Sequence, residues 1–93
     1  MTVAVLSVEL YLPLCASLKE KRMVLRRVKD RLAAQNVSVA EVAYQDVWQR
    51  AGLGIAAVAS SDRMAEQILR AALELIERLE PDLVTSSHME FIR

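Results

Sequence analysis

Hydrophobic and polar residues alternate near the start of the chain. Between residues 3 and 12 every even position is apolar, whereas the odd positions include Ser7 and Glu9. Alternation with a period of two is typical of a β-strand that buries one face. The segment therefore predicts a strand, which Pro13 ends.

The pattern changes to a helical period after Ser17. Ser17 and Glu20 have the S-x-x-E spacing of a capping box, in which the two residues satisfy each other's backbone amides at a helix start. At about 100° per residue, the following apolar residues fall within about one third of the helix circumference. They are Leu18, Val24, Leu25, Val28 and Leu32. This pattern predicts a helix that runs to about Gln35 and buries one face.

The rest of the chain predicts two more strands, a second helix and a last strand. The β-branched and small apolar runs at 37–44 and 51–59 predict strands joined by a short loop, QDVWQ. Residues 60–62, Ser-Ser-Asp, offer N-caps for a helix that Pro81 closes. Apolar residues recur along it at helical spacing: Met64, Ile68, Ala71, Leu75 and Leu79. Weaker alternation over 82–92 predicts the last strand.

The predicted order is βαββαβ in a single domain, residues 1–93. Right-handed crossovers would place both helices on one face of a four-stranded antiparallel sheet, which is the α+β ferredoxin-like sandwich. The other sheet face would then carry Val3, Val5 and Tyr11 without cover. This is more apolar surface than a small monomer usually exposes. We therefore expect a homodimer that packs through the open sheet face.

Composition indicates a folded domain in a reducing compartment. Apolar residues make up 54% of the chain, which argues against disorder. The one cysteine, Cys15, cannot form an internal disulfide. The N-terminal segment lacks a basic leader, and the uncharged stretch at 51–61 is too short to span a bilayer. We expect a cytoplasmic protein with no membrane partner.

Charge is distributed unevenly along this neutral chain. Residues 1–50 hold eight basic and five acidic side chains, a net charge of +3, and residues 51–93 hold four and seven, a net charge of −3. Seven of the twelve Lys and Arg residues lie within 17–31. On the predicted helix, four of them form one cationic row beside the buried face: Lys19, Arg22, Arg26 and Lys29.

The cationic row predicts a surface that contacts a phosphate backbone. Like charges at i+3 and i+4 destabilise a helix by about 0.2–0.5 kcal/mol per pair, and cations in the first turn oppose the helix dipole. A bound anion would relieve both penalties. Two alternatives remain open. The row is a solvated face neutralised by acids such as Asp30, Glu74 or Glu77, or it binds an acidic protein partner.

The loop between the two central runs supplies two further candidates. It holds the only Trp, Trp48, close to Arg50, and both are candidates for contact with nucleic acid. Alternatively, Trp48 covers a sheet edge or a dimer contact. The nearby Gly52 and Gly54 are too closely spaced for a phosphate-binding fingerprint, and they more simply mark a bulge or a close backbone approach.

Residues that could support catalysis are few. His88 and Glu90 share one side of the last predicted strand, but no nucleophile or oxyanion donor can be assigned near them. Cys15 precedes the first helix, where the helix dipole and Lys19 would lower its pKa, although an inert thiol is the simpler interpretation. We predict no catalytic residue, no cofactor and no metal site.

Three segments resemble a known family: SLKEKR at 17–22, NVSVAEV at 36–42 and QDVWQRAGLGIA at 45–56. With them the chain resembles the YlxP-like family of small uncharacterised bacterial proteins along nearly its whole length. The resemblance implies a ferredoxin-like fold and a gene often found beside translation and ribosome-maturation factors, which favours RNA or the ribosome as partner. It implies no known reaction.

The sequence thus predicts a non-enzymatic protein that binds RNA or a ribosomal particle. The expected contacts are Lys19, Arg22, Arg26, Lys29, Trp48 and Arg50. The alternative is a homodimeric interaction module whose basic helix meets an acidic protein.

Overall fold

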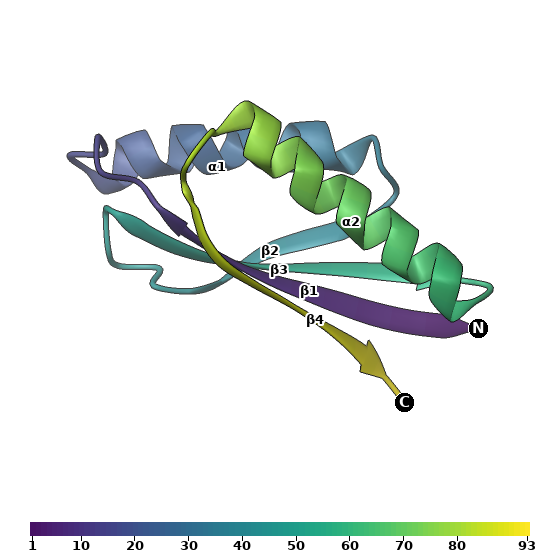
Figure 1. Ribbon diagram of the computed structural model, residues 1–93. Helices are drawn as coiled ribbons and strands as arrows, with labels where there is room; N and C mark the ends of the chain where they lie inside the picture. The colour runs from purple at the N-terminus through teal and green to yellow at the C-terminus, as the bar shows by residue number, and fades with distance from the viewer.

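The elements follow one another in the predicted order in the computed structural model, which describes residues 1–93. They are β1 (Thr2–Tyr11), α1 (Leu18–Ala33), β2 (Ser38–Ala43), β3 (Arg50–Ala59), α2 (Asp62–Leu79) and β4 (Val84–Ile92). The strands form one antiparallel sheet in the order β2-β3-β1-β4, and both helices cover the same face (Figure 1). The ferredoxin-like prediction is confirmed. Neither helix is apolar over a length that could cross a membrane.

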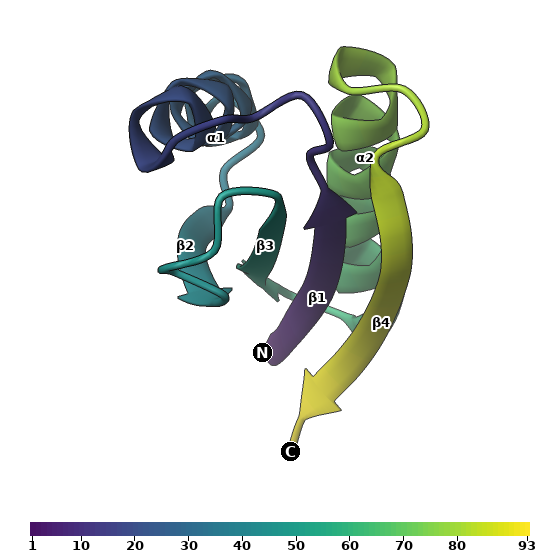
Figure 2. The same cartoon turned by 90° about the vertical axis from the view of Figure 1, so that its left-hand side faces the viewer.

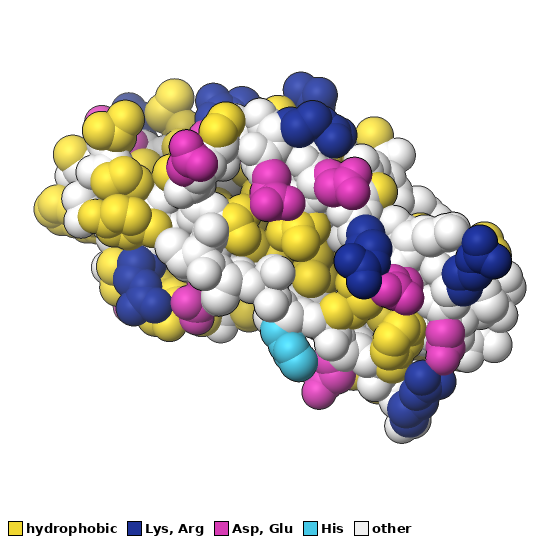
Figure 3. Space-filling view, viewed as in Figure 1, with side chains coloured by type: hydrophobic (Ala, Val, Ile, Leu, Met, Phe, Trp, Pro, Cys, Tyr) yellow, Lys and Arg dark blue, Asp and Glu magenta, His cyan; other side chains and the backbone are white.

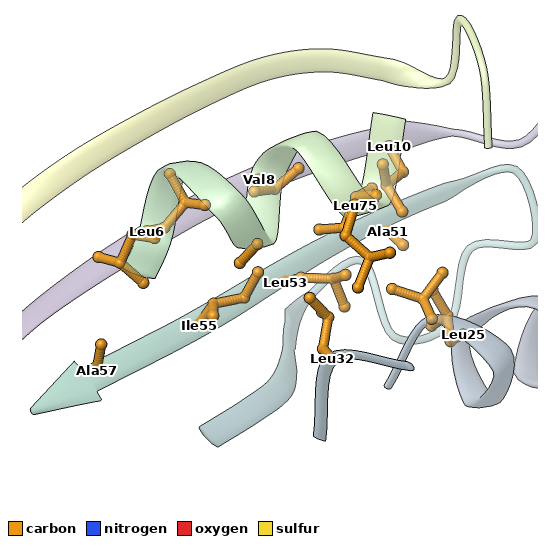
Figure 4. Packing of buried hydrophobic residues seen from close by; sticks show 14 of the residues in the cluster. Leu6, Val8, Leu10, Leu25, Leu32, Ala51, Leu53, Ile55, Ala57 and Leu75 are labelled. Carbon is orange, nitrogen blue, oxygen red and sulfur yellow. The ribbon is translucent and has the colours of Figure 1, made fainter. Parts of the chain in front are cut away.

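The core lies between the sheet and the helices (Figure 4). The two central strands contribute alternate residues that are almost fully buried: Ala4, Leu6, Val8 and Leu10 from β1, and Ala51, Leu53, Ile55 and Ala57 from β3. Leu25, Val28 and Leu32 of α1 pack onto them. Full burial of each large apolar side chain contributes about 1.5–3 kcal/mol. The alternation in β1 therefore decides which face of the sheet the helices cover.

The buried face of α2 is shifted by about one residue from the predicted face. The buried residues are Ala65, Leu69, Ala72, Leu75 and Ile76, whereas Met64 and Ala71 are exposed. Ala65 and Ala72 are fully buried, and small side chains of this kind let a helix approach its neighbours closely. Of the residues that the spacing singled out, Leu75 is buried and Ile68 and Leu79 pack against the core, so the prediction was wrong at Met64 and Ala71.

Both helices begin at the predicted caps. The Ser17 hydroxyl accepts a hydrogen bond from the Glu20 amide at 3.1 Å, and the Ser61 hydroxyl accepts one from the Met64 amide at 3.2 Å. The Glu20 carboxylate accepts from the amide of Ala16, so the reciprocal half of the capping box closes one residue earlier than the usual form.

A close approach between two strands accounts for Gly52. The pairing of β2 with β3 shifts between Glu41 and Ala43, and a β-carbon at position 52 would lie 2.7 Å from the Ala43 Cβ. At Gly54 the added atom would lie 3.3 Å from Val42 Cγ1. The structural interpretation of the two glycines is confirmed at Gly52, where only glycine avoids a steric clash.

The sheet face opposite the helices has no cover (Figures 1 and 2). Val3 of β1 pairs with Val58 on one side and Ile92 on the other, so these three side chains lie in one row across the sheet. Val58 is 58% exposed and Ile92 is 51% exposed. The open face thus carries an apolar row at the end where the chain begins and ends.

Candidate nucleic-acid interface

The cationic row of α1 has no carboxylate partner within the chain. Ion pairs with N···O distances up to 4.0 Å involve five of the twelve Lys and Arg residues: Lys21, Arg27, Arg50, Arg70 and Arg93. Seven cations are therefore unpaired, and five of these lie on α1: Lys19, Arg22, Arg26, Lys29 and Arg31. The acids that the solvated-face interpretation offered as partners, Asp30, Glu74 and Glu77, pair with none of them.

Three members of the cationic row line a shared hollow. Arg22, Arg26 and Lys29 surround an open depression of about 230 Å³ together with Leu25, Asp30 and Glu41. Since Glu41 belongs to the edge strand β2, the hollow lies between α1 and that edge. Lys19 extends the row toward the start of the helix, and the ten steps from Lys19 to Lys29 rise about 15 Å along the axis.

Lys21 belongs to the basic segment but faces the protein interior. The residue is 1% exposed, and its Nζ donates hydrogen bonds to the carbonyl oxygens of Tyr44 at 2.6 Å and Val47 at 2.7 Å. Glu41 Oε2 lies 2.6 Å from the same nitrogen. That oxygen is buried and receives no hydrogen bond, so the contact is an ion pair between a buried ammonium and a carboxylate whose side chain is 20% exposed. Such a pair is stable only when both partners are present.

The sequence contains a signal for this burial that our prediction missed. At about 100° per residue, Lys21 lies between Val28 and Leu32 at the centre of the apolar arc of α1. A lysine in that position is almost never buried without a partner. Its partners come from β2 and the loop that follows, so they cannot be identified by helical periodicity.

The β2–β3 loop, residues 44–49, is held at both of its ends. Tyr44 has a left-handed backbone with φ 62°, a conformation that costs a bulky residue about 1–2 kcal/mol. The hydrogen bonds from Lys21 oppose this cost. At the other end, the Gln49 carbonyl accepts from the Leu12 amide at 2.8 Å, and the Gln49 side chain donates to the Pro13 carbonyl at 3.2 Å.

Trp48 lies within this anchored loop and is 51% exposed. Figure 2 views this end of the molecule, with the first turn of α1 above the loop. Since Lys21 reaches the Val47 carbonyl from α1, the residue before Trp48 is within one lysine side chain of the helix. The structure therefore places the backbone of this loop against the first turns of α1, the helix that carries the cationic row.

Arg50, by contrast, lies on the open sheet face and not with the cationic row. Its guanidinium is 3.4 Å from Glu9 Oε2 and 2.9 Å from the Tyr44 hydroxyl, and it stacks 4.0 Å above the centre of the Tyr44 ring. The Tyr44 hydroxyl also donates to Glu9 at 3.1 Å. Arg50 thus already has a carboxylate partner, and its contacts help to hold the strained Tyr44.

The environment of Cys15 favours an inert thiol. Burial, followed by the nearby Glu20 carboxylate, raises the pKa of the Cys15 thiol and outweighs the opposite effect of Lys21. A protonated thiol is a poor nucleophile.

His88 is exposed on β4, opposite Ser7 of β1.

Similar solved structures share the fold at low sequence identity. A de novo designed protein with ferredoxin fold, LFR1 1, has a TM-score of 0.56 at 16% identity, over 99% of this chain and 83% of that one. A C-terminal segment of the α subunit of aIF2 from Pyrococcus abyssi has a TM-score of 0.53 at 19% identity, over 98% of this chain and 50% of that one. At such identities the likeness concerns the fold alone.

Relatives found by sequence identify the family of the chain, which similarity of fold alone does not. The curated protein "Uncharacterized protein YlxP" of Bacillus subtilis (strain 168) is 50% identical over 62 residues, which cover 66% of this chain and 67% of that protein. The family described as "Protein of unknown function (DUF503)" matches residues 3–89. The chain therefore belongs to this family, as the YlxP-like segments of its sequence predicted.

Proposed function

We propose that this protein binds RNA, free or within a ribosomal particle, through the cationic row, and that it acts in the cytoplasm by binding and not by catalysis. The observation that carries the proposal is the lack of carboxylate partners along the row, although five other cations of the chain have them. Adjacent like charges cost helix stability. A phosphate backbone would supply the missing anions along the helix.

The hollow beside the row also supports phosphate as the ligand. Two guanidinium groups and an ammonium group line it with the carboxylates of Asp30 and Glu41. Glu41 is already paired with Lys21, so cations remain in excess, and arginine binds phosphate through paired N–H donors. Leu25 is its only hydrophobic lining residue. An acidic protein would need an apolar centre to its interface, because the fully buried part of a protein interface is depleted in charge. The surface of α1 around the hollow offers little apolar area for the centre of such an interface.

Purification of the tagged protein from native cells, with and without RNase, tests the proposal. We expect RNA or ribosomal particles to co-purify and to be lost after RNase treatment. The variant Arg22→Gln/Arg26→Gln should lose them without RNase. Its matched control is Arg63→Gln/Arg78→Gln, which removes two unpaired arginines of α2 and should bind normally. Association that survives RNase would indicate an acidic protein partner and would overturn the proposal.

We also propose that a second copy of the chain covers the open sheet face. The apolar row of Val3, Val58 and Ile92 would be buried in such a dimer. Toward the other end of the same face, Arg50 and Glu9 are paired within one chain, so their burial would leave no isolated charge. Because α1 lies on the opposite side of the sheet, the cationic row would remain accessible.

Sedimentation velocity at micromolar concentration tests the dimer. The wild-type protein should sediment as a dimer, and Val58→Asp, which places a charge in the apolar row, should sediment as a monomer. Val42→Asp places the same charge on the edge strand β2, outside the apolar row, and should weaken the dimer less. A wild-type monomer at these concentrations would contradict the proposal.

A further inference from the structure

We propose that Trp48 stacks on an unpaired base of the bound RNA, so that the protein prefers single-stranded or looped RNA to a continuous duplex. The inference rests on the proposed function and names its ligand more closely. It depends on three features of the structure: the construction of the 44–49 loop, its attachment to the helix that carries the cationic row, and the exposure of the indole.

The loop that carries Trp48 is held in a fixed shape at a cost in stability. The shape requires a left-handed Tyr44 and the burial of the charged Lys21, whose two hydrogen bonds both go to carbonyls of this loop. Strain and buried charge of this kind persist only where many contacts support them, and they often mark a functional segment. Here they support a segment whose tryptophan leaves about half of its surface exposed.

The position of the loop links Trp48 to the cationic row. Lys21 directly precedes Arg22 in α1, and its ammonium reaches the Val47 carbonyl. Arg22 also lines the hollow together with Glu41 of β2, the strand that leads into the loop. A polyanion in the hollow therefore lies between the cations of α1 and the strand that leads to Trp48. One ligand can contact the cations with its phosphates and the indole with a base.

The surroundings of Trp48 suit a flat apolar group. Hydrophobic side chains gather at this end of the molecule in Figure 3, where α1 begins and the 44–49 loop lies (Figure 1). The exposed Leu14 and Val47 belong to the two loops that meet there. A ligand with both phosphate groups and flat apolar rings matches the cations and the indole together, and a nucleotide has that composition.

The same geometry discriminates between forms of RNA. A single strand can place a base on the indole, and such stacking strengthens binding by about five- to a hundredfold. In an A-form duplex the bases are stacked inside the helix, and the narrow major groove excludes side chains. A duplex would therefore gain from the cationic row but not from Trp48.

Binding of a labelled 12-nucleotide oligouridine and a 12-base-pair RNA duplex tests the inference. We expect the single strand to quench the fluorescence of Trp48, which is the only tryptophan. Trp48→Ala should weaken single-strand binding by about tenfold and change duplex binding less than twofold, whereas Trp48→Phe should keep most of the affinity. Urea unfolding of each variant checks that the fold is retained.

The outcomes separate the inference from the function on which it rests. If Arg22→Gln/Arg26→Gln loses both RNA forms and Trp48→Ala binds both like the wild type, the stacking inference is wrong and the role of the row stands. If the wild type binds neither RNA, the proposed function fails, and the inference fails with it.

Discussion

The Lys21 ammonium donates a hydrogen bond to the Tyr44 carbonyl oxygen across a distance of 2.6 Å. This bond joins the first turns of α1 to a loop 23 residues further along the chain. A second hydrogen bond from the same ammonium, to the Val47 carbonyl at 2.7 Å, joins two of the segments that carry the family resemblance, SLKEKR and QDVWQR. One buried side chain therefore fixes the loop that carries Trp48 to the helix that carries the cationic row.

Replacement of Lys21 by methionine should destabilise the protein strongly. The variant would leave Glu41 as a charge without its partner, and it would remove the donors for the carbonyls of Tyr44 and Val47. We expect a loss of roughly 2–4 kcal/mol in the free energy of unfolding, measured by urea denaturation. Lys19→Met is the control because Lys19 is exposed and unpaired, and it should change stability by less than about 0.5 kcal/mol.

A second substitution tests the cause of that loss. Adding Glu41→Leu to Lys21→Met removes the unpaired carboxylate and should restore part of the stability. Equal stability of Lys21→Met and Lys19→Met would show that the buried contacts do not hold the loop.

The fold could be predicted from the sequence because its main determinants are local. In β1 the alternation of apolar residues specifies which face is buried, and in α1 the helical period places Lys19, Arg22, Arg26 and Lys29 on one side. These periodicities do not depend on the rest of the chain. The position of the cationic row on the helix was therefore predictable from residue spacing alone.

The remaining parts of the site depend on contacts between distant residues. Lys21 stands out by its place in the apolar arc of α1, but its partners, Glu41 and the 44–49 loop, are far from it in the sequence. Arg50 follows Trp48 closely in the sequence, yet the pairing of β3 with β1 turns it toward Glu9 on the open face. Similarly, the apolar arc of α2 is wide, and close packing through its alanines decides which part of the arc faces the core.

Gly52→Ala should destabilise the sheet because its new methyl group would lie 2.7 Å from the Ala43 Cβ. We expect a loss of about 1–3 kcal/mol in thermal or urea unfolding. Gly54→Ala should cost less, since Val42 Cγ1 can move away from its added methyl group. In an Ala43→Gly background the obstacle is absent, and Gly52→Ala should then be nearly neutral. An equal cost in both backgrounds would contradict this explanation.

The Asp62 carboxylate should stabilise the protein near neutral pH and lose this effect in acid. Hydrogen bonds from Arg93 and Thr2 hold the pKa of Asp62 below its ordinary value. The folded state therefore binds fewer protons at this site than the unfolded state does. Its stabilisation is present above the unfolded pKa and disappears as the pH falls through the folded pKa.

The variant Asp62→Asn should thus be less stable than the wild type at pH 7, and the difference should shrink below about pH 4. Urea unfolding at a series of pH values measures both effects. A difference that stays constant down to about pH 2 would show that the carboxylate charge is not responsible.

Cys15 should react slowly with thiol reagents while the protein is folded. The residue is buried and its raised pKa keeps it protonated at neutral pH, so only a small fraction is thiolate. Labelling with a chromogenic disulfide at pH 7 should be slow in buffer and fast in urea. Rapid labelling of the folded protein would instead indicate an activated thiol.

The salt dependence of RNA binding tests the role of the cationic row most directly. Affinity for a single-stranded RNA, measured by fluorescence anisotropy from low to physiological salt, should fall with a log–log slope of about −3 if four side chains each contact a phosphate. Arg22→Gln/Arg26→Gln should bind more weakly, with a slope of about −1.5. A wild-type affinity that does not change with salt, or an identical slope in the variant, would contradict the assignment of these cations to a phosphate backbone.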